Sequence, residues 1–133
     1  MMRTLAATIL VSDDEPQILD MLVGLLTRAG YCVLTATRPE NAISICSNRE
    51  TSIDLVISDF EMGGLNGLQM AQEIIAVRPG LEFIFFSGNP QALIDLSTQG
   101  FTCLQKPCDI AILLATIRDV LERSRQRLAG HRE

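Results

Sequence analysis

Five short apolar runs alternate with segments of helical periodicity, and this alternation constrains the fold more than any other feature of the sequence. Most of the runs are apolar throughout, whereas a strand with one solvent-exposed face alternates apolar and polar residues. They therefore predict strands buried on both faces, in a parallel sheet that helices cover on each side. The runs are Leu5–Ser12, Tyr31–Thr35, Ile53–Ser58, Leu81–Ser87 and Phe101–Gln105.

The segments between these runs carry start signals for helices. Pro16 follows acidic residues, Asn66 precedes a glycine, and Asn89 precedes a proline, all of which suit the first positions of a helix. A weaker helix is expected around residues 39–48, where serine and asparagine are poor helix formers. The last helix should begin at Cys108 or Asp109 and carry an apolar stripe formed by Ile110, Leu113, Leu114, Ile117 and Leu121.

Five strand-then-helix units predict an α/β fold of the flavodoxin-like, doubly wound (βα)5 kind, with a parallel five-stranded sheet in the order 2-1-3-4-5. The 133 residues match the length of one domain. We expect a single domain with its core at about residues 7–123. Residues 124–133 should form a basic helix end and tail, because five arginines between 118 and 132 suggest a solvated helix face.

Composition excludes several classes of function. The net charge of −5 argues against direct nucleic-acid binding, and no apolar run approaches the length of a membrane span. The four cysteines form no CxxC pair and His131 is the only histidine, which argues against a zinc site or a histidine base. We expect reduced cysteines in the cytoplasm, with Cys32 and Cys103 acting as small hydrophobic residues inside strands.

Polar side chains follow the predicted strands at the point where each strand ends. Asp13 and Asp14 follow the first strand, Asp59 ends the third, Ser87 ends the fourth and Lys106 follows the fifth. The carboxyl ends of parallel strands meet at one edge of the sheet, so these groups should converge. Clustered carboxylates favour a hard cation such as Mg²⁺, and a lysine with a hydroxyl suits a phosphoryl group. Taken singly, each motif could instead be a helix cap, a turn or a solvated side chain.

Four motifs in this order resemble the receiver domain of two-component response regulators over about residues 7–123. They are ILVSDDEP at Ile9–Pro16, IDLVISDFEMGGLNGL at Ile53–Leu68, FFSG at Phe85–Gly88 and LQKP at Leu104–Pro107. The resemblance implies that Asp59 is the phosphoacceptor, with Ser87 and Lys106 bonded to the phosphoryl group. It also implies backbone N–H contacts to that group from Phe60, Glu61 and Gly88. The implied Mg²⁺ ligands are Asp13, Asp14, Asp59 and the backbone carbonyl of Glu61, and Pro107 would follow a cis peptide bond.

Three positions depart from the family pattern. Gly63 stands where the family usually has a proline after the acceptor, and Gly64 follows it, which should loosen that loop. Glu61 adds a carboxylate two residues after Asp59, where it can modulate dephosphorylation or contact a metal-bound water. Cys103 stands where the family usually has tyrosine or phenylalanine. We therefore expect the switch to operate mainly through the loop after Ser87 and the following helix.

The resemblance implies a phosphorylatable cytoplasmic switch that catalyses only its own phosphorylation and dephosphorylation. Its partner would be a sensor histidine kinase or a histidine phosphotransfer protein, and two copies could pair through the fourth helix, fifth strand and fifth helix. The FFSG and LQKP stretches also suit a receiver excised from a hybrid kinase or a larger regulator. A phosphorylation-independent pseudo-receiver is the main alternative. An aspartate-nucleophile phosphohydrolase fits less well. Such enzymes have two acids separated by one residue at the end of the first strand, whereas the acids of this chain are adjacent there.

Overall fold

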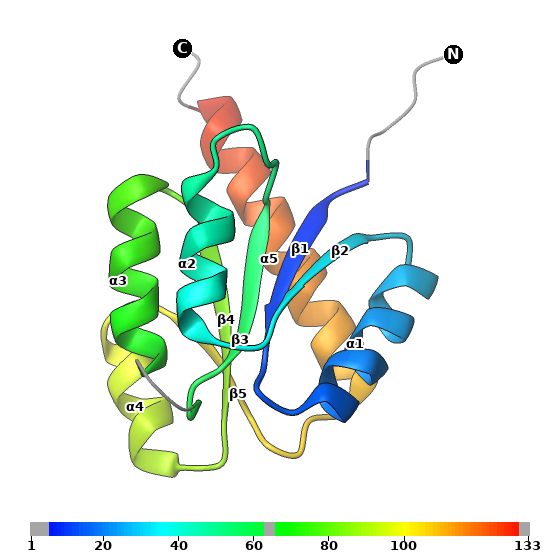
Figure 1. The fold of residues 1–133 in the computed structure, drawn as a ribbon, viewed down its shortest axis with the longest axis vertical. Coiled ribbons are helices and arrows are strands. Elements are labelled where there is room, and N and C mark those ends of the chain that lie inside the picture. The colour runs from blue at the N-terminus through cyan, green and yellow to red at the C-terminus, as the bar shows by residue number, and fades with distance from the viewer. Residues whose placement is uncertain (1–5, 63–65, 131–133) are drawn as a thin grey trace.

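A computed structural model describes residues 6–62 and 66–130, with side chains to residue 127. Its parallel sheet has the order β2-β1-β3-β4-β5, which confirms the predicted topology (Figure 1). The expected first strand from Leu5 is shorter, and Leu5 itself lies outside the described residues. The strands are β1 (Thr8–Ser12), β2 (Cys32–Ala36), β3 (Leu55–Asp59), β4 (Glu82–Ser87) and β5 (Thr102–Gln105).

Helices cover both faces of the sheet. The core cluster on one face holds residues of α2, α3 and α4, and the cluster on the other holds residues of α1 and α5. The carboxyl ends of the strands lie at the lower edge in Figure 1, opposite both termini. Among the described residues, no helix is both long and apolar enough to cross a membrane. The helices are α1 (Pro16–Arg28), α2 (Pro39–Ser47), α3 (Gly67–Val77), α4 (Pro90–Thr98) and α5 (Ile110–Gly130).

Burial is complete only in the middle of the sheet, which corrects the expectation of strands buried on both faces. All residues of β3 are buried, whereas β2 and β5 are half-buried or exposed along most of their length. Both are edge strands, so each has a neighbouring strand on one side only. The prediction of a hydrophobic role for Cys32 was wrong for the same reason, because that residue is exposed at the β2 edge.

The helix starts around the site follow the capping signals in the sequence. The Asn66 side chain accepts from the Gln69 N–H, and the Gln69 side chain accepts from the Asn66 N–H in return. At the start of α4, Asn89 caps the helix and Pro90 takes its first position. Gly67 is required by packing, since a Cβ there would lie 2.8 Å from the Phe60 ring. This close approach holds α3 against the segment that follows Asp59.

The last helix departs from the prediction in two respects. Its buried stripe runs through Leu113, Ile117 and Val120, and Ile110 is 52% exposed. The expected solvated arginine face is only partly solvated, because Arg127 lies 2.9 Å from Glu82 Oε2 and Arg123 lies 3.5 Å from Glu82 Oε1. Glu82 is the first residue of β4, so these ion pairs connect the C-terminal part of α5 to the sheet.

Candidate functional site

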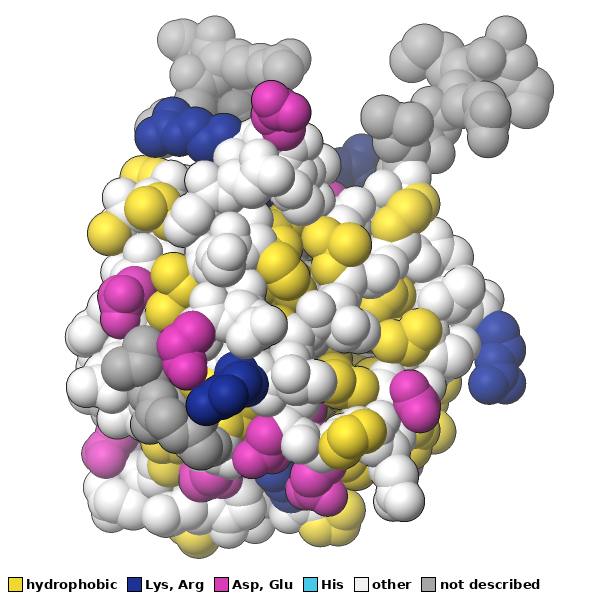
Figure 2. Space-filling view, in the orientation of Figure 1, with side chains coloured by type: hydrophobic (Ala, Val, Ile, Leu, Met, Phe, Trp, Pro, Cys, Tyr) yellow, Lys and Arg dark blue, Asp and Glu magenta, His cyan; other side chains and the backbone are white. Residues whose placement is uncertain are grey.

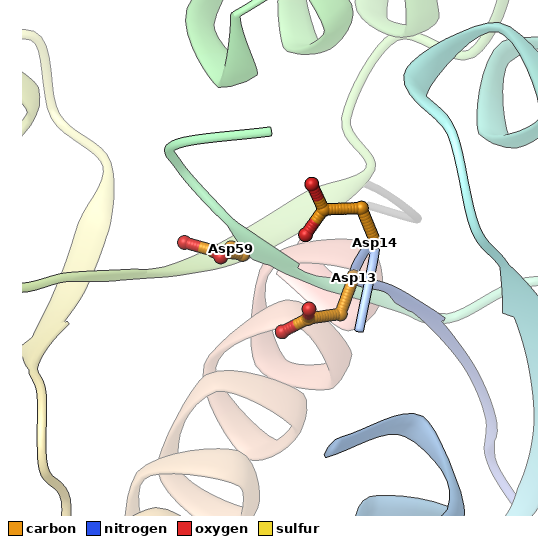
Figure 3. Close-up of side chains that lie close together, drawn as sticks. All are labelled: Asp13, Asp14 and Asp59. Atoms are coloured by element: carbon orange, nitrogen blue, oxygen red, sulfur yellow. The ribbon is translucent and has the colours of Figure 1, made fainter. Parts of the chain in front are cut away.

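Three carboxylates meet at the carboxyl ends of β1 and β3, as the sequence predicted. Oxygen atoms of Asp13, Asp14 and Asp59 all lie within 4.8 Å of one another, and their side chains project to the same side (Figure 3). Direct pairing of β1 with β3 brings these strand ends together. Asp13 and Asp59 are 6% and 5% exposed, while Asp14 is open to solvent. This set of oxygen ligands suits a hard divalent cation.

Lys106 neutralises part of this negative charge. Its Nζ lies 2.8 Å from Asp59 Oδ1, which also accepts from the Glu61 N–H at 3.2 Å. Burial lowers the pKa of Lys106, but the hydrogen bond and charge of Asp59, with smaller contributions from Asp13 and Glu61, raise it above its ordinary value overall. The ammonium therefore stays charged at neutral pH and holds one Asp59 oxygen in place.

The folded structure disfavours the charged form of Asp13. Burial raises its pKa, and the charges of Asp59 and Asp14 raise it further. The Glu15 N–H, which donates to Asp13 Oδ1 at 2.9 Å, and the Lys106 charge act in the opposite direction without cancelling the rise. A bound cation would relieve this repulsion, so the electrostatics and the ligand chemistry both favour a metal here.

Ser87 connects the site to α4. Its side chain is fully buried, and its Oγ donates to Glu61 Oε2 at 2.5 Å and accepts from the Asn89 N–H at 3.0 Å. The contact between Ser87 and Glu61 was missed by sequence reasoning, since the residues are 26 positions apart and no periodic pattern relates them. Asp59, Lys106 and Ser87 thus lie in one site through direct contacts or shared neighbours.

Three further expectations have different outcomes. The Lys106–Pro107 peptide bond is cis, as expected. The Phe60 N–H, expected to bind a phosphoryl group, instead donates to the Phe86 carbonyl at 2.8 Å as part of the sheet. That donor is already used, and the Glu61 N–H is the one directed at Asp59. Gly63 and Gly64, where a looser loop was expected, lie outside the described residues.

Cys103 lies on the sheet face that α3 and α4 cover. It pairs in register with Phe85 on β4 and is half-buried against the aromatic cluster of that face. Burial raises the pKa of its thiol. Beside it lies a shallow groove of about 550 Å³, which is lined by residues of α4 and β5, including Leu93, Ile94 and Gln105. Cys103 itself is one of the residues that line this groove.

A mostly apolar cavity of about 440 Å³ lies next to Lys106 and was not foreseen from the sequence. Residues of α1, including Ile18 and Met21, form one wall, while Pro107 and Ile110 belong to the other. Met21 and Ile110 are 55% and 52% exposed, so apolar surface continues outside the cavity. Hydrophobic and acidic side chains gather together near the lower edge of the molecule in Figure 2.

Comparison with known proteins identifies the family. Residues 9–118 match the family model described as the response regulator receiver domain. The chain belongs to the receiver domain family. A crystal structure of a receiver domain protein from Clostridium thermocellum superposes on this receiver with a TM-score of 0.84 at 32% identity, covering 90% of this chain and 98% of that one.

Longer signalling proteins contain similar receivers. The transcriptional regulatory protein GlrR of Escherichia coli is 37% identical over 121 residues, which are 89% of this chain and 27% of that protein. The sensor kinase CckA of Brucella abortus is 28% identical over 121 residues, again 89% of this chain but 13% of the kinase. This receiver therefore spans about a quarter or less of the length of these two relatives.

The raised pKa of Asp13 predicts a stabilising substitution. In metal-free buffer at pH 7, Asp13→Asn should raise the free energy of unfolding by about 1 kcal/mol, because it removes the buried charge and keeps the oxygen that accepts from Glu15. Urea unfolding of both proteins at several pH values measures this.

The sign of the pH dependence follows from the direction of the shift. Because the folded pKa of Asp13 is raised, the stability that the wild-type carboxyl provides is fully present below its unfolded pKa. That stability is lost as the pH rises through the folded pKa, so the advantage of Asp13→Asn should vanish below about pH 4. An advantage that persists unchanged in acid would contradict the assigned cause.

Proposed function

We propose that this receiver is a phosphorylatable switch in which Asp59 accepts a phosphoryl group from a phosphohistidine. An Asp59 carboxylate oxygen attacks phosphorus, the phosphorus–nitrogen bond breaks, and the imidazole leaves with the bonding electron pair. The observation that carries the proposal is the contact of Asp59 Oδ1 with the Lys106 ammonium at 2.8 Å and the Glu61 N–H at 3.2 Å. These donors orient the carboxylate, and the ammonium offsets charge on the transferring group.

We propose that Mg²⁺ is the cofactor of this site. Asp13, Asp14 and Asp59 would hold it, together with the Glu61 backbone carbonyl. When bound, Mg²⁺ would supply positive charge to the transferring phosphoryl oxygens. Two observations support the assignment: oxygen atoms of the three aspartates lie within 4.8 Å of one another, and the pKa of Asp13 is raised. A divalent cation would offset the repulsion among these acids.

The remaining residues would hold the product. We assign the Ser87 hydroxyl, the Lys106 ammonium and the N–H groups of Glu61 and Gly88 to the phosphoryl oxygens. Gly88 suits this role because there is open space around the position of a Cβ at this residue. Phe60 is left out of the assignment, since its N–H is bonded to Phe86. The presence of Asp59, Lys106 and the acidic pair in one site favours this function over a pseudo-receiver.

The apolar cavity beside Lys106 supports a protein partner for the transfer. We propose that helices bearing the phosphohistidine, in a histidine kinase or phosphotransfer protein, dock on α1 and the start of α5. Exposed Met21 and Ile110 border the cavity, and apolar surface of this kind marks interaction sites. The cavity reaches Lys106, so a helix seated there would bring its histidine to Asp59.

The output of the switch would leave through α4 and β5. Phosphorylation would displace the loop after Ser87 and α4, because Cys103 lacks the bulk to signal by moving an aromatic ring. Pairing of two copies through α4, β5 and α5 stays a prediction, to which the 59% and 54% exposure of Ile94 and Ile112 lends support. The single-domain boundaries, the cytoplasmic location, the lack of nucleic-acid binding and the lack of any further enzymatic activity stay predictions too. The origin from a hybrid kinase or a larger regulator stays an alternative to a stand-alone regulator.

Phosphorylation by a small donor tests the acceptor. Incubation with phosphoramidate and Mg²⁺ should add the mass of one phosphoryl group, read by intact mass spectrometry. Asp59→Asn should abolish this addition, and Lys106→Ala should slow it about a hundredfold by removing charge stabilisation. Asp20→Asn, an exposed acid of α1, is the matched control and should label normally. Labelling that survives Asp59→Asn would rule out the assignment.

Metal binding should stabilise the fold by mass action. With a dissociation constant of about 1 mM, about 10 mM Mg²⁺ should add roughly 1.4 kcal/mol to the free energy of unfolding. Asp14→Ala should remove this gain without lowering metal-free stability, because it deletes a ligand that is exposed and surrounded by like charge. Urea unfolding at matched ionic strength measures both. An equal gain in the variant would place the cation elsewhere.

Partner docking can be separated from chemistry. Met21→Asp should lower phosphotransfer at least tenfold from whichever kinase labels the receiver in a panel of purified histidine kinases. A charge there disrupts the apolar surface beside the cavity. Labelling by phosphoramidate should be unchanged. Val77→Asp, which introduces the same charge at the far end of α3, is the control. Equal transfer to the Met21 variant would exclude this surface.

A further inference from the structure

The hydroxyl of Ser87 is already bonded to a carboxylate. Ser87 Oγ donates to Glu61 Oε2 at 2.5 Å, within the range of charge-assisted O–H···O⁻ bonds. Ser87 is fully buried, whereas Glu61 is exposed and carries its carboxylate inward from the segment after Asp59. The negative charge of Glu61 also contributes, less than that of Asp59, to the raised pKa of Lys106.

A serine hydroxyl has one proton and can donate one hydrogen bond at a time. Ser87 therefore cannot bond Glu61 and a phosphoryl oxygen together. We propose that Glu61 is a positioning residue that latches the unphosphorylated receiver, its carboxylate occupying the Ser87 hydroxyl that a phosphoryl group on Asp59 would take. The proposal rests on the function assigned to Asp59 above. Phosphorylation then exchanges one anionic partner of Ser87 for another.

The latch extends to the first turn of α4. Ser87 Oγ accepts from the Asn89 N–H at 3.0 Å, and Asn89 Oδ1 accepts from the Gln91 N–H at 2.9 Å as the cap of α4. Glu61, Ser87, Asn89 and Gln91 thus form one string of hydrogen bonds. When the bond between Ser87 and Glu61 breaks, the Ser87 hydroxyl turns to another partner. Ser87 Oγ is the acceptor of the Asn89 N–H, so that hydrogen bond changes as well. The helix start therefore responds to whichever anion holds Ser87.

Labelling rates test the latch. In saturating Mg²⁺, Glu61→Ala should react with phosphoramidate about five- to tenfold faster than wild type, because Ser87 no longer has to leave a charged partner. Glu61→Gln should lie between them, since its amide oxygen still accepts a weaker, neutral bond. Glu15→Gln is the control for charge, because Glu15 is an exposed acid beside the site whose side chain does not cap α1. A Glu61→Ala rate no greater than that of Glu15→Gln overturns the proposal.

A double-mutant cycle shows whether Glu61 acts through Ser87. In the Ser87→Ala background the acceleration by Glu61→Ala should fall to the level of Glu15→Gln, since the hydroxyl that the latch holds is gone. An acceleration of the same size in both backgrounds also overturns the proposal. Failure of every variant to label would instead contradict the role of Asp59.

Amide chemical shifts test the contact without any phosphoryl transfer. In the unphosphorylated protein, Glu61→Ala should shift the backbone amide signals of Asn89 and Gln91, and Glu15→Gln should leave them in place. This result tests the contact between Glu61 and Ser87 separately from the role of Asp59 as the acceptor. Unchanged signals at both residues overturn it, whatever the labelling rates are.

Discussion

The ion pair between Lys106 and Asp59, with 2.8 Å between Nζ and Oδ1, makes the rest of the acidic edge possible. A buried carboxylate beside other carboxylates is costly in its charged form, and it protonates unless a cation offsets the repulsion. Burial raises the pKa of Asp13, and the charges of Asp59 and Asp14 raise it further, because one ammonium faces three acids. A divalent cation would relieve the part that comes from repulsion. Burial and repulsion together therefore account for the raised pKa, and the repulsion favours the proposed metal.

Close contacts connect this site to the surrounding helices α3 and α4. The close approach of Gly67 to the Phe60 ring holds α3 against the segment that follows Asp59. On the other side, Ser87 connects the site to the capped start of α4 through Asn89. The competition for one serine proton is the physical basis of the proposed latch, because a buried hydroxyl can satisfy one anion but not two. The site and the start of α4 are thus linked by short contacts.

Most of the fold was predictable because it depends on local patterns. Apolar runs, capping asparagines such as Asn66 and Asn89, and first-position prolines identified every strand and helix. The predictions for Cys32 and Phe60 were wrong because they depend on which strands lie side by side in the sheet. Cys32 is exposed because β2 lies at an edge, and the Phe60 N–H is used because β3 pairs with β4 in register. Neither fact depends on the residues adjacent to Cys32 or Phe60 in the chain.

The sequence by itself determined the residues of the site, because Asp13, Asp59 and Lys106 each end or follow a strand whose direction places its end at a common edge. Only the tertiary structure decided which of their atoms touch. The bond of Ser87 to Glu61 and the apolar cavity beside Lys106 join segments far apart in the chain. A periodic pattern in the sequence predicts which face of a strand or helix a side chain lies on. The hydrogen-bond partner of that side chain depends on distances between segments that are far apart in the chain, and only the packing of the folded protein sets these distances.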